Sequence, residues 1–172
     1  MKRLGLLVLL ACDQTAEIGS RYAAQQMVSA AQGGAVAAPA GDELAGASLQ
    51  LPPGALPADA LVTLDRGAGP LILDPPPAGP VVVFTPVVAL QRPATVTLPL
   101  RLGPGQSAAD VMVLTSDPGG QLTKIDHALL SIEGDRVRFA TPHLGPFEPA
   151  AVLHCIQVCP NGWTCLNGEC HP

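Results

Sequence analysis

The feature that most constrains the fold of this chain is a series of short apolar segments with a two-residue period, separated by turns rich in glycine and proline. In residues 95–102, valine or leucine occupies every second position, and threonine or arginine most of the others. Successive side chains of a β-strand point to opposite faces, so this segment predicts a strand with one buried face. Residues 47–51 alternate similarly, whereas residues 81–84 are apolar throughout and predict a strand buried on both faces. Such strands predict an all-β fold, an antiparallel β-sandwich, with an open barrel as the alternative.

Turn sequences join several of these segments. The apolar residues on either side of Glu-Gly-Asp at 133–135 predict one hairpin, and those on either side of Ser-Asp-Pro-Gly-Gly at 116–120 predict a second. Pro99 lies inside the clearest strand and predicts an edge position or a bulge there, because proline has no N–H to donate. The proline-rich residues 74–80 predict a stiff surface loop. About 120 residues are enough for one core.

The first twelve residues determine the expected compartment. Lys2 and Arg3 precede the apolar run from Leu4 to Ala11. As a helix, this run would be only about 12 Å long, against a hydrocarbon core of about 30 Å. Residues 1–11 therefore predict a secretory signal peptide. Leu-Leu-Ala-Cys at 9–12 resembles the lipobox of bacterial lipoproteins, although Leu10 is bulkier than usual.

The lipobox resemblance implies that Cys12 becomes the N-terminal residue and carries two or three acyl chains. One acyl chain holds a protein to a membrane only marginally, whereas two or three acyl chains make the anchoring effectively permanent. The expected location is the cell envelope, on the extracytoplasmic side of a membrane. The alternatives are an ordinary signal peptide or a buried N-terminus. Residues 12–32 predict a lipidated tether, in which Ile18, Tyr22 and Val28 have the loose spacing of a short helix.

Residues 151–172 predict a cysteine-rich tail. In an oxidising compartment, four cysteines within eighteen residues indicate disulfides, and their spacing resembles a fragment of an EGF-like knot. Three pairings are possible, and we favour Cys155–Cys165 with Cys159–Cys170. The alternative is a zinc-binding tail, because His154 and His171 flank the cysteines; we expect no metal.

Composition limits the classes of partner. Hydrophobic residues make up 48% of the chain and charged residues 13%, as in a folded domain. Removal of Lys2 and Arg3 with the signal peptide takes the formal charge from −5 to −7. The chain has no basic stripe for nucleic acid, and its charge also argues against electrostatic binding to anionic lipid.

Short motifs between residues 31 and 150 resemble one known family. Gly-Gly-Ala-Val at 33–36 and Leu-Gln-Leu-Pro-Pro-Gly-Ala-Leu at 49–56 are similar to the signature of ZU5 domains, the β-sandwich modules of ankyrins and netrin receptors. Residues 83–86 with 92–99 resemble the next block of that family, and residues 141–147 resemble its closing His-Phe-Ser strand. The resemblance implies a ZU5-like β-sandwich over residues 33–150.

Catalysis is not expected. Some ZU5 domains cleave themselves when the serine of His-Phe-Ser attacks the preceding carbonyl, but Gly145 stands at that position here and has no nucleophile. We expect His143 to be a turn or strand-end residue. The chain has no Gly-x-Ser-x-Gly elbow, and Ser116 with Asp117 predicts a turn rather than half of a triad.

The sequence therefore predicts a lipid-anchored, non-catalytic binding or structural module with no cofactor. Its partner would be a protein or glycan of the envelope. Trp163, the single tryptophan, packs against a disulfide or offers an exposed aromatic contact to that partner. The alternative function is a small exported hydrolase or inhibitor.

Overall fold

The computed structural model describes residues 22–153, 159–166 and 169–171. These residues form thirteen β-strands and one 3-10 helix. In chain order the elements are β1 Ala24–Val28, β2 Gly34–Ala37, β3 Ser48–Leu51, β4 Ala60–Arg66, β5 Val82–Thr85, β6 Ala89–Pro99, β7 Gln106–Ser116, β8 Leu122–Ile125, η1 His127–Leu129, β9 Ser131–Glu133, β10 Arg136–His143, β11 Pro146–Leu153, β12 Thr164–Leu166 and β13 Glu169–His171. No helix within the described ranges is long and apolar enough to span a membrane. The predicted signal peptide, residues 1–11, and the first part of the tether lie outside these ranges.

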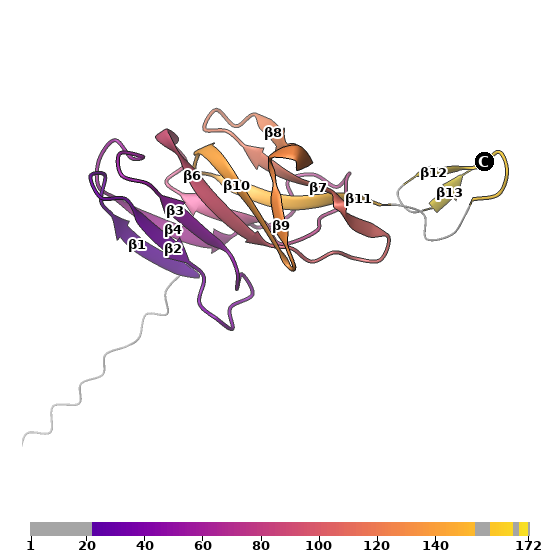
Figure 1. The fold of residues 1–172 in the computed structure, drawn as a ribbon, viewed down its shortest axis with the longest axis horizontal. Coiled ribbons are helices and arrows are strands. Elements are labelled where there is room, and N and C mark those ends of the chain that lie inside the picture. Colours follow the sequence, from indigo (N-terminus) through magenta and orange to yellow (C-terminus); the bar gives the residue numbers. More distant parts are fainter. Residues whose placement is uncertain (1–21, 154–158, 167–168, 172) are drawn as a thin grey trace, which may run out of the picture.

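Two antiparallel sheets pack face to face (Figure 1). The first sheet has the strand order β1-β4-β5-β11-β7-β8, and the second sheet has the order β2-β3-β6-β10-β9. Strands β12 and β13 form a separate small sheet in the tail. The predicted fold class, an all-β antiparallel sandwich, is confirmed.

The core lies between the two sheets, because their strands direct alternate apolar side chains to the inner faces. In β10, exposed and buried residues alternate from Arg136 to His143. Phe147 of β11 is fully buried. The centroid of its ring lies 6.2 Å from that of Phe84 and 5.4 Å from that of Phe139, and the rings are tilted against each other. Tilted aromatic pairs at these distances are favourable, so the three phenylalanines join the sheets.

Most of the predicted strands lie where the sequence placed them. Residues 47–51 correspond to β3, and residues 81–84 correspond to β5, which lies inside the first sheet between β4 and β11. The two predicted hairpins are the antiparallel pairs β9–β10 and β7–β8. These are the segments in which periodicity and turn chemistry agree.

The position of Pro99 differs from the one that the sequence predicts. The sequence predicts an edge strand or a bulge at this proline, but β6 lies inside the second sheet, between β3 and β10. The strand instead ends at Pro99, which pairs with Arg136, so the missing N–H falls where the ladder stops. The irregularity in the β6–β10 pairing lies near the other end, between Thr141 and His143.

The predicted helix in the tether is wrong for residues 24–28, which form strand β1. This strand pairs with β4, with Ala24 opposite Leu64 and Val28 opposite Ala60. Val28 is buried in the core. Three apolar residues at a loose spacing do not distinguish a helix from an edge strand, and burial against β4 decides between them. The first sheet therefore begins before Gly33, where the sequence placed the start of the sandwich.

The loop of residues 67–80, here called the strap, lies against β11. The backbone N–H of Ala78 donates to the carbonyl of Pro149 at 2.7 Å, and the N–H of Ala151 donates to the carbonyl of Pro76 at 3.2 Å. A Cβ on Gly79 would lie 2.5 Å from the carbonyl oxygen of Pro99, so only glycine fits there. The predicted surface loop is thus part of the packed structure, with Ala78 fully buried.

Candidate functional site

One of the two favoured disulfides is present in the tail. Cys159 and Cys170 are bonded, with their Cα atoms 5.4 Å apart. Cys165 lies on β12 opposite Cys170 on β13. The other favoured bond, Cys155–Cys165, involves Cys155, which lies outside the described residues.

The metal alternative concerns the same part of the chain. Cys159 and Cys170, as a disulfide, do not provide thiolates to a zinc ion. His154 and the predicted lipidation site Cys12 lie outside the described ranges. Among the residues that the structure describes, no group of three or more His, Cys, Asp or Glu side chains could hold a metal ion.

Trp163 lies immediately before β12, at the end of a tight turn. Its N–H donates to the carbonyl of Pro160 at 2.9 Å, and Gly162 supplies the positive φ of 89° that this turn requires. The tryptophan is 46% exposed. Part of the indole is therefore accessible, and its contact with a partner stays a prediction.

His143 is the last residue of β10 and is nearly buried. Its ring stacks on that of Phe147, with a centroid distance of 5.7 Å and an interplanar angle of 18°. Its Nε2 lies 3.0 Å from the hydroxyl oxygen of Thr115, which donates its own proton to the carbonyl of Pro146. We therefore infer that Nε2 carries a proton and donates to Thr115. Burial lowers the pKa of His143, although the charge of Asp117 opposes this.

Gly145 is buried beside His143 in a closely packed position. A Cβ added to this glycine would lie 3.0 Å from the carbonyl oxygen of Ser116. The carbonyl of Gly145 accepts a hydrogen bond from the N–H of Phe84 at 3.0 Å. The imidazole of His143 is hydrogen-bonded to Thr115, and Gly145 has no hydroxyl. The corner formed by residues 143–145 is therefore a packed strand end.

Ser116 and Asp117 have the turn role that the sequence predicts. The Asp117 carboxylate accepts a hydrogen bond from the N–H of Gln121 at 2.8 Å, and its carbonyl accepts one from the N–H of Gly120 at 2.9 Å. These bonds hold the turn between β7 and β8.

Glu148 is a buried carboxylate for which the sequence carries no signal. It lies on β11 and is 1% exposed. Its Oε2 accepts a hydrogen bond from the N–H of Leu71 in the strap at 2.6 Å. Burial raises the pKa of Glu148, and backbone hydrogen bonds from Leu71 and Ile72 partly counteract this. A hollow of about 250 Å³ lies beside it, between Arg66 and Pro80.

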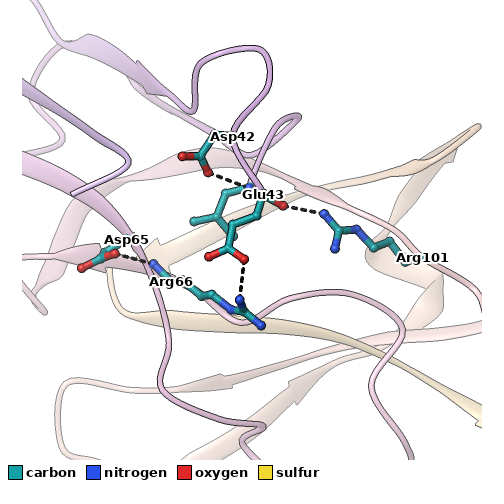
Figure 2. Close-up of polar contacts among 6 residues, drawn as sticks. Asp42, Glu43, Asp65, Arg66 and Arg101 are labelled. Atoms are coloured by element: carbon teal, nitrogen blue, oxygen red, sulfur yellow. Dashed lines mark hydrogen bonds and ion pairs between the residues drawn. The ribbon is translucent and has the colours of Figure 1, made fainter. Parts of the chain in front are cut away.

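Two arginines fix the loop before β3 (Figure 2). Arg66 pairs with the carboxylate of Glu43, and Arg101 donates to the carbonyl of the same residue. The Asp42 carboxylate accepts a hydrogen bond from the N–H of Leu44 at 2.7 Å, and Leu44 itself is buried. Exposed ion pairs contribute little to stability by themselves. We therefore interpret these contacts as fixing the conformation of the loop that places Leu44 in the core.

The outer surface of the second sheet, here called the open face, carries exposed or half-buried residues such as Ala35, Gln50, Thr95, Thr97 and Arg138. Three hollows lie along it, with volumes of about 380, 530 and 460 Å³. All three hollows are open to solvent rather than enclosed.

Only polar residues line the hollow of about 380 Å³, here called the polar hollow. They are Thr97, Ser131, Glu133, Asp135, Arg136 and Arg138. Arg138 of β10 lies opposite Thr97 of β6 on one side and opposite Ser131 of β9 on the other. A guanidinium between two hydroxyls on adjacent strands presents hydrogen-bond donors to the same space. The hollow can therefore hold a polar ligand.

No protein-family model and no curated protein matches this chain. The ZU5 and lipobox resemblances therefore stay predictions from short motifs.

Proposed function

We propose that this chain is an exported lipoprotein, held to a membrane through Cys12, that binds an envelope partner through the open face and does not catalyse a reaction. The observation that carries the binding role is the polar hollow around Arg138. It is lined by hydrogen-bonding side chains from three adjacent strands. A rigid sheet presents such groups without the entropic cost of ordering a loop, which favours binding.

The contrast between β11 of the first sheet and strands β3 and β10 of the second sheet supports the choice of face. On the first sheet, the strap lies against β11, and Glu148 and Ala150 are buried. On the second sheet, Gln50 and Arg138 are exposed. The open face therefore offers polar groups that a partner can reach.

The tail supports export. Disulfides form and persist mainly in oxidising compartments outside the cytosol, and Cys159 is bonded to Cys170. This bond agrees with the predicted signal peptide at residues 1–11.

The anchoring and the binding face can be tested in one experiment on cells that export the full chain. A photo-crosslinking amino acid is placed at Gln50 on the open face or, as a matched control, at Leu61. Leu61 is 48% exposed and belongs to the first sheet. We expect membrane-bound protein that crosslinks to one discrete partner from Gln50 but not from Leu61. We also expect that the Cys12→Ser variant is not processed or is not bound to the membrane.

Two results would contradict the proposal. Equal crosslinking from Gln50 and Leu61 would show that the open face is not the binding surface. Normal processing and membrane attachment of Cys12→Ser would exclude lipidation as the anchor.

A further inference from the structure

We propose that the polar hollow binds an acidic saccharide, whose carboxylate pairs with Arg138 and whose hydroxyls bond to Thr97, Ser131 and Glu133. This inference rests on the proposed function, because it names the ligand of the open face.

Arg138 is available for a ligand. Among the Lys and Arg side chains of the described ranges, it alone has neither a hydrogen bond nor an ion pair. The others have partners: Arg66 with Glu43, Arg92 with the Pro53 carbonyl, Arg101 with the Glu43 carbonyl, Lys124 with Asp126 and Arg136 with Asp135. A guanidinium matches the geometry of a carboxylate through two parallel hydrogen bonds.

The two hydroxyls beside Arg138 are also available. Thr97 and Ser131 are its register partners on β6 and β9. Within the described part of the chain, neither hydroxyl has a hydrogen-bond partner. Residues directly opposite each other on adjacent strands have Cβ atoms about 4.5–5.5 Å apart, so one bound group can reach all three side chains.

The acidic residues of the hollow decide what else the ligand must carry. Asp135 is paired with Arg136 at 3.8 Å, but Glu133 has no partner among the described residues. Glu133 would repel a simple oxyanion bound nearby. A ligand that combines a carboxylate with hydroxyls avoids this, because its hydroxyls donate to Glu133 while its carboxylate accepts from Arg138. Sugar acids have this combination.

The lining also predicts weak binding of a single sugar unit. It contains no aliphatic or aromatic residue, so a sugar ring gains little from apolar contact there. We expect millimolar affinity for one unit. A polymer that continues into the neighbouring hollows, which are lined in part by Gln50 and Thr95 and by Ser48, would bind more tightly because its units are linked.

The test is an NMR titration of the full-length protein with D-glucuronate, D-glucose and acetate, at constant ionic strength set with sodium chloride. The signals followed are the Arg138 side-chain Nε–H and the amides of Thr97 and Ser131. We expect saturable shifts with D-glucuronate and binding of D-glucose and of acetate that is about tenfold weaker or more, because each lacks one half of the interaction.

Three variants localise the effect. Arg138→Gln should abolish saturable binding of D-glucuronate, and Arg138→Lys should weaken it, because lysine cannot form the paired hydrogen bonds. Arg92→Gln is the matched control, since Arg92 is an exposed arginine outside the hollow, and it should bind like the wild type. Equal binding of D-glucose or of acetate, or unchanged binding by Arg138→Gln, would overturn the inference.

This titration does not depend on the anchor or on a cellular partner. Crosslinking from Gln50 without binding of D-glucuronate would overturn the saccharide inference alone. Binding of D-glucuronate together with normal processing and membrane attachment of Cys12→Ser would overturn the anchor alone.

Discussion

Glu148 on β11 accepts a hydrogen bond at 2.6 Å from the backbone N–H of Leu71, a residue 77 positions earlier in the chain. The carboxylate is buried beneath the strap and replaces water as the acceptor for this loop. A buried N–H without an acceptor is costly, so Glu148 holds the first half of the strap while the N–H of Ala78 holds the second half on Pro149.

Glu148 should make the stability of the protein depend on pH. Burial raises the pKa of Glu148 in the folded state. The protonated carboxyl therefore contributes to the free energy of unfolding in full below the pKa of the unfolded state, and this contribution is lost as the pH rises through the pKa of the folded state. Glu148→Gln removes this dependence and keeps an acceptor oxygen for Leu71. Denaturant unfolding should therefore show the wild type gaining stability relative to Glu148→Gln as the pH falls from 7 to about 4.

Glu148→Ala is the control for the hydrogen bonds themselves. It leaves the N–H groups of Leu71 and Ile72 without their acceptor and should lower the free energy of unfolding by about 1–3 kcal/mol at either pH. A wild type that loses stability relative to Glu148→Gln on acidification would mean that the folded pKa is depressed instead.

His143 should act in the opposite direction. Its folded pKa is lowered by burial, so the imidazole contributes stability above its unfolded pKa, and this contribution is lost as the pH falls through the folded value. His143→Gln retains a donor for Thr115 and does not titrate. Between pH 7 and pH 5, the wild type should lose more stability than this variant. NMR titration of the imidazole should give a midpoint below about 6.5; a midpoint above this value would contradict the packing of His143.

The tail should be separable from the sandwich only beyond Leu153. Strand β11 continues past residue 150, with Ala151 opposite Val111 and Leu153 opposite Gln106, and Ala150 and Ala151 are fully buried. Removal of residues 154–172 should leave the thermal unfolding midpoint of the sandwich nearly unchanged. Removal of residues 150–172 should lower it by several degrees or abolish folding, because buried strand pairs are lost. Equal stability of the two truncations would contradict the observed end of β11.

The fold was predictable where local periodicity and turn chemistry agree. The turn at residues 133–135 predicted the β9–β10 hairpin, and the alternation in residues 95–99 placed Thr97 on an outer face. Strand β1 was not predictable, because alanine is a weak strand former and the pairing of β1 with β4 is a contact between distant residues.

The candidate site was less predictable than the fold. The alternation around Val137 and Phe139 indicated that Arg138 points outward, and the hairpin placed Ser131 near it. The third of these residues of the polar hollow, Thr97, lies on β6, and no turn in the sequence specifies the pairing of β6 with β10. Glu148 had no sequence signal, because its burial depends on how the strap folds back over β11.

The protein should remain a single chain. Gly145 offers no hydroxyl to attack the preceding carbonyl, and His143 is engaged with Thr115. Long incubation at neutral pH followed by reducing electrophoresis should show one band. Gly145→Ser should also stay intact but be less stable by about 1–3 kcal/mol, because its Cβ would lie 3.0 Å from the Ser116 carbonyl oxygen. A fragment with a new N-terminus at Gly145 in the wild type would contradict this view of the corner.

The most direct test of the proposed lipoprotein is mass spectrometry of the protein purified from the membranes of cells that export the full chain. We expect an N-terminal peptide that begins at Cys12, lacks residues 1–11 and carries two or three acyl chains, with a thioether-linked lipid on the thiol. An N-terminal peptide that retains Met1, or one that begins at another residue without lipid, would contradict it.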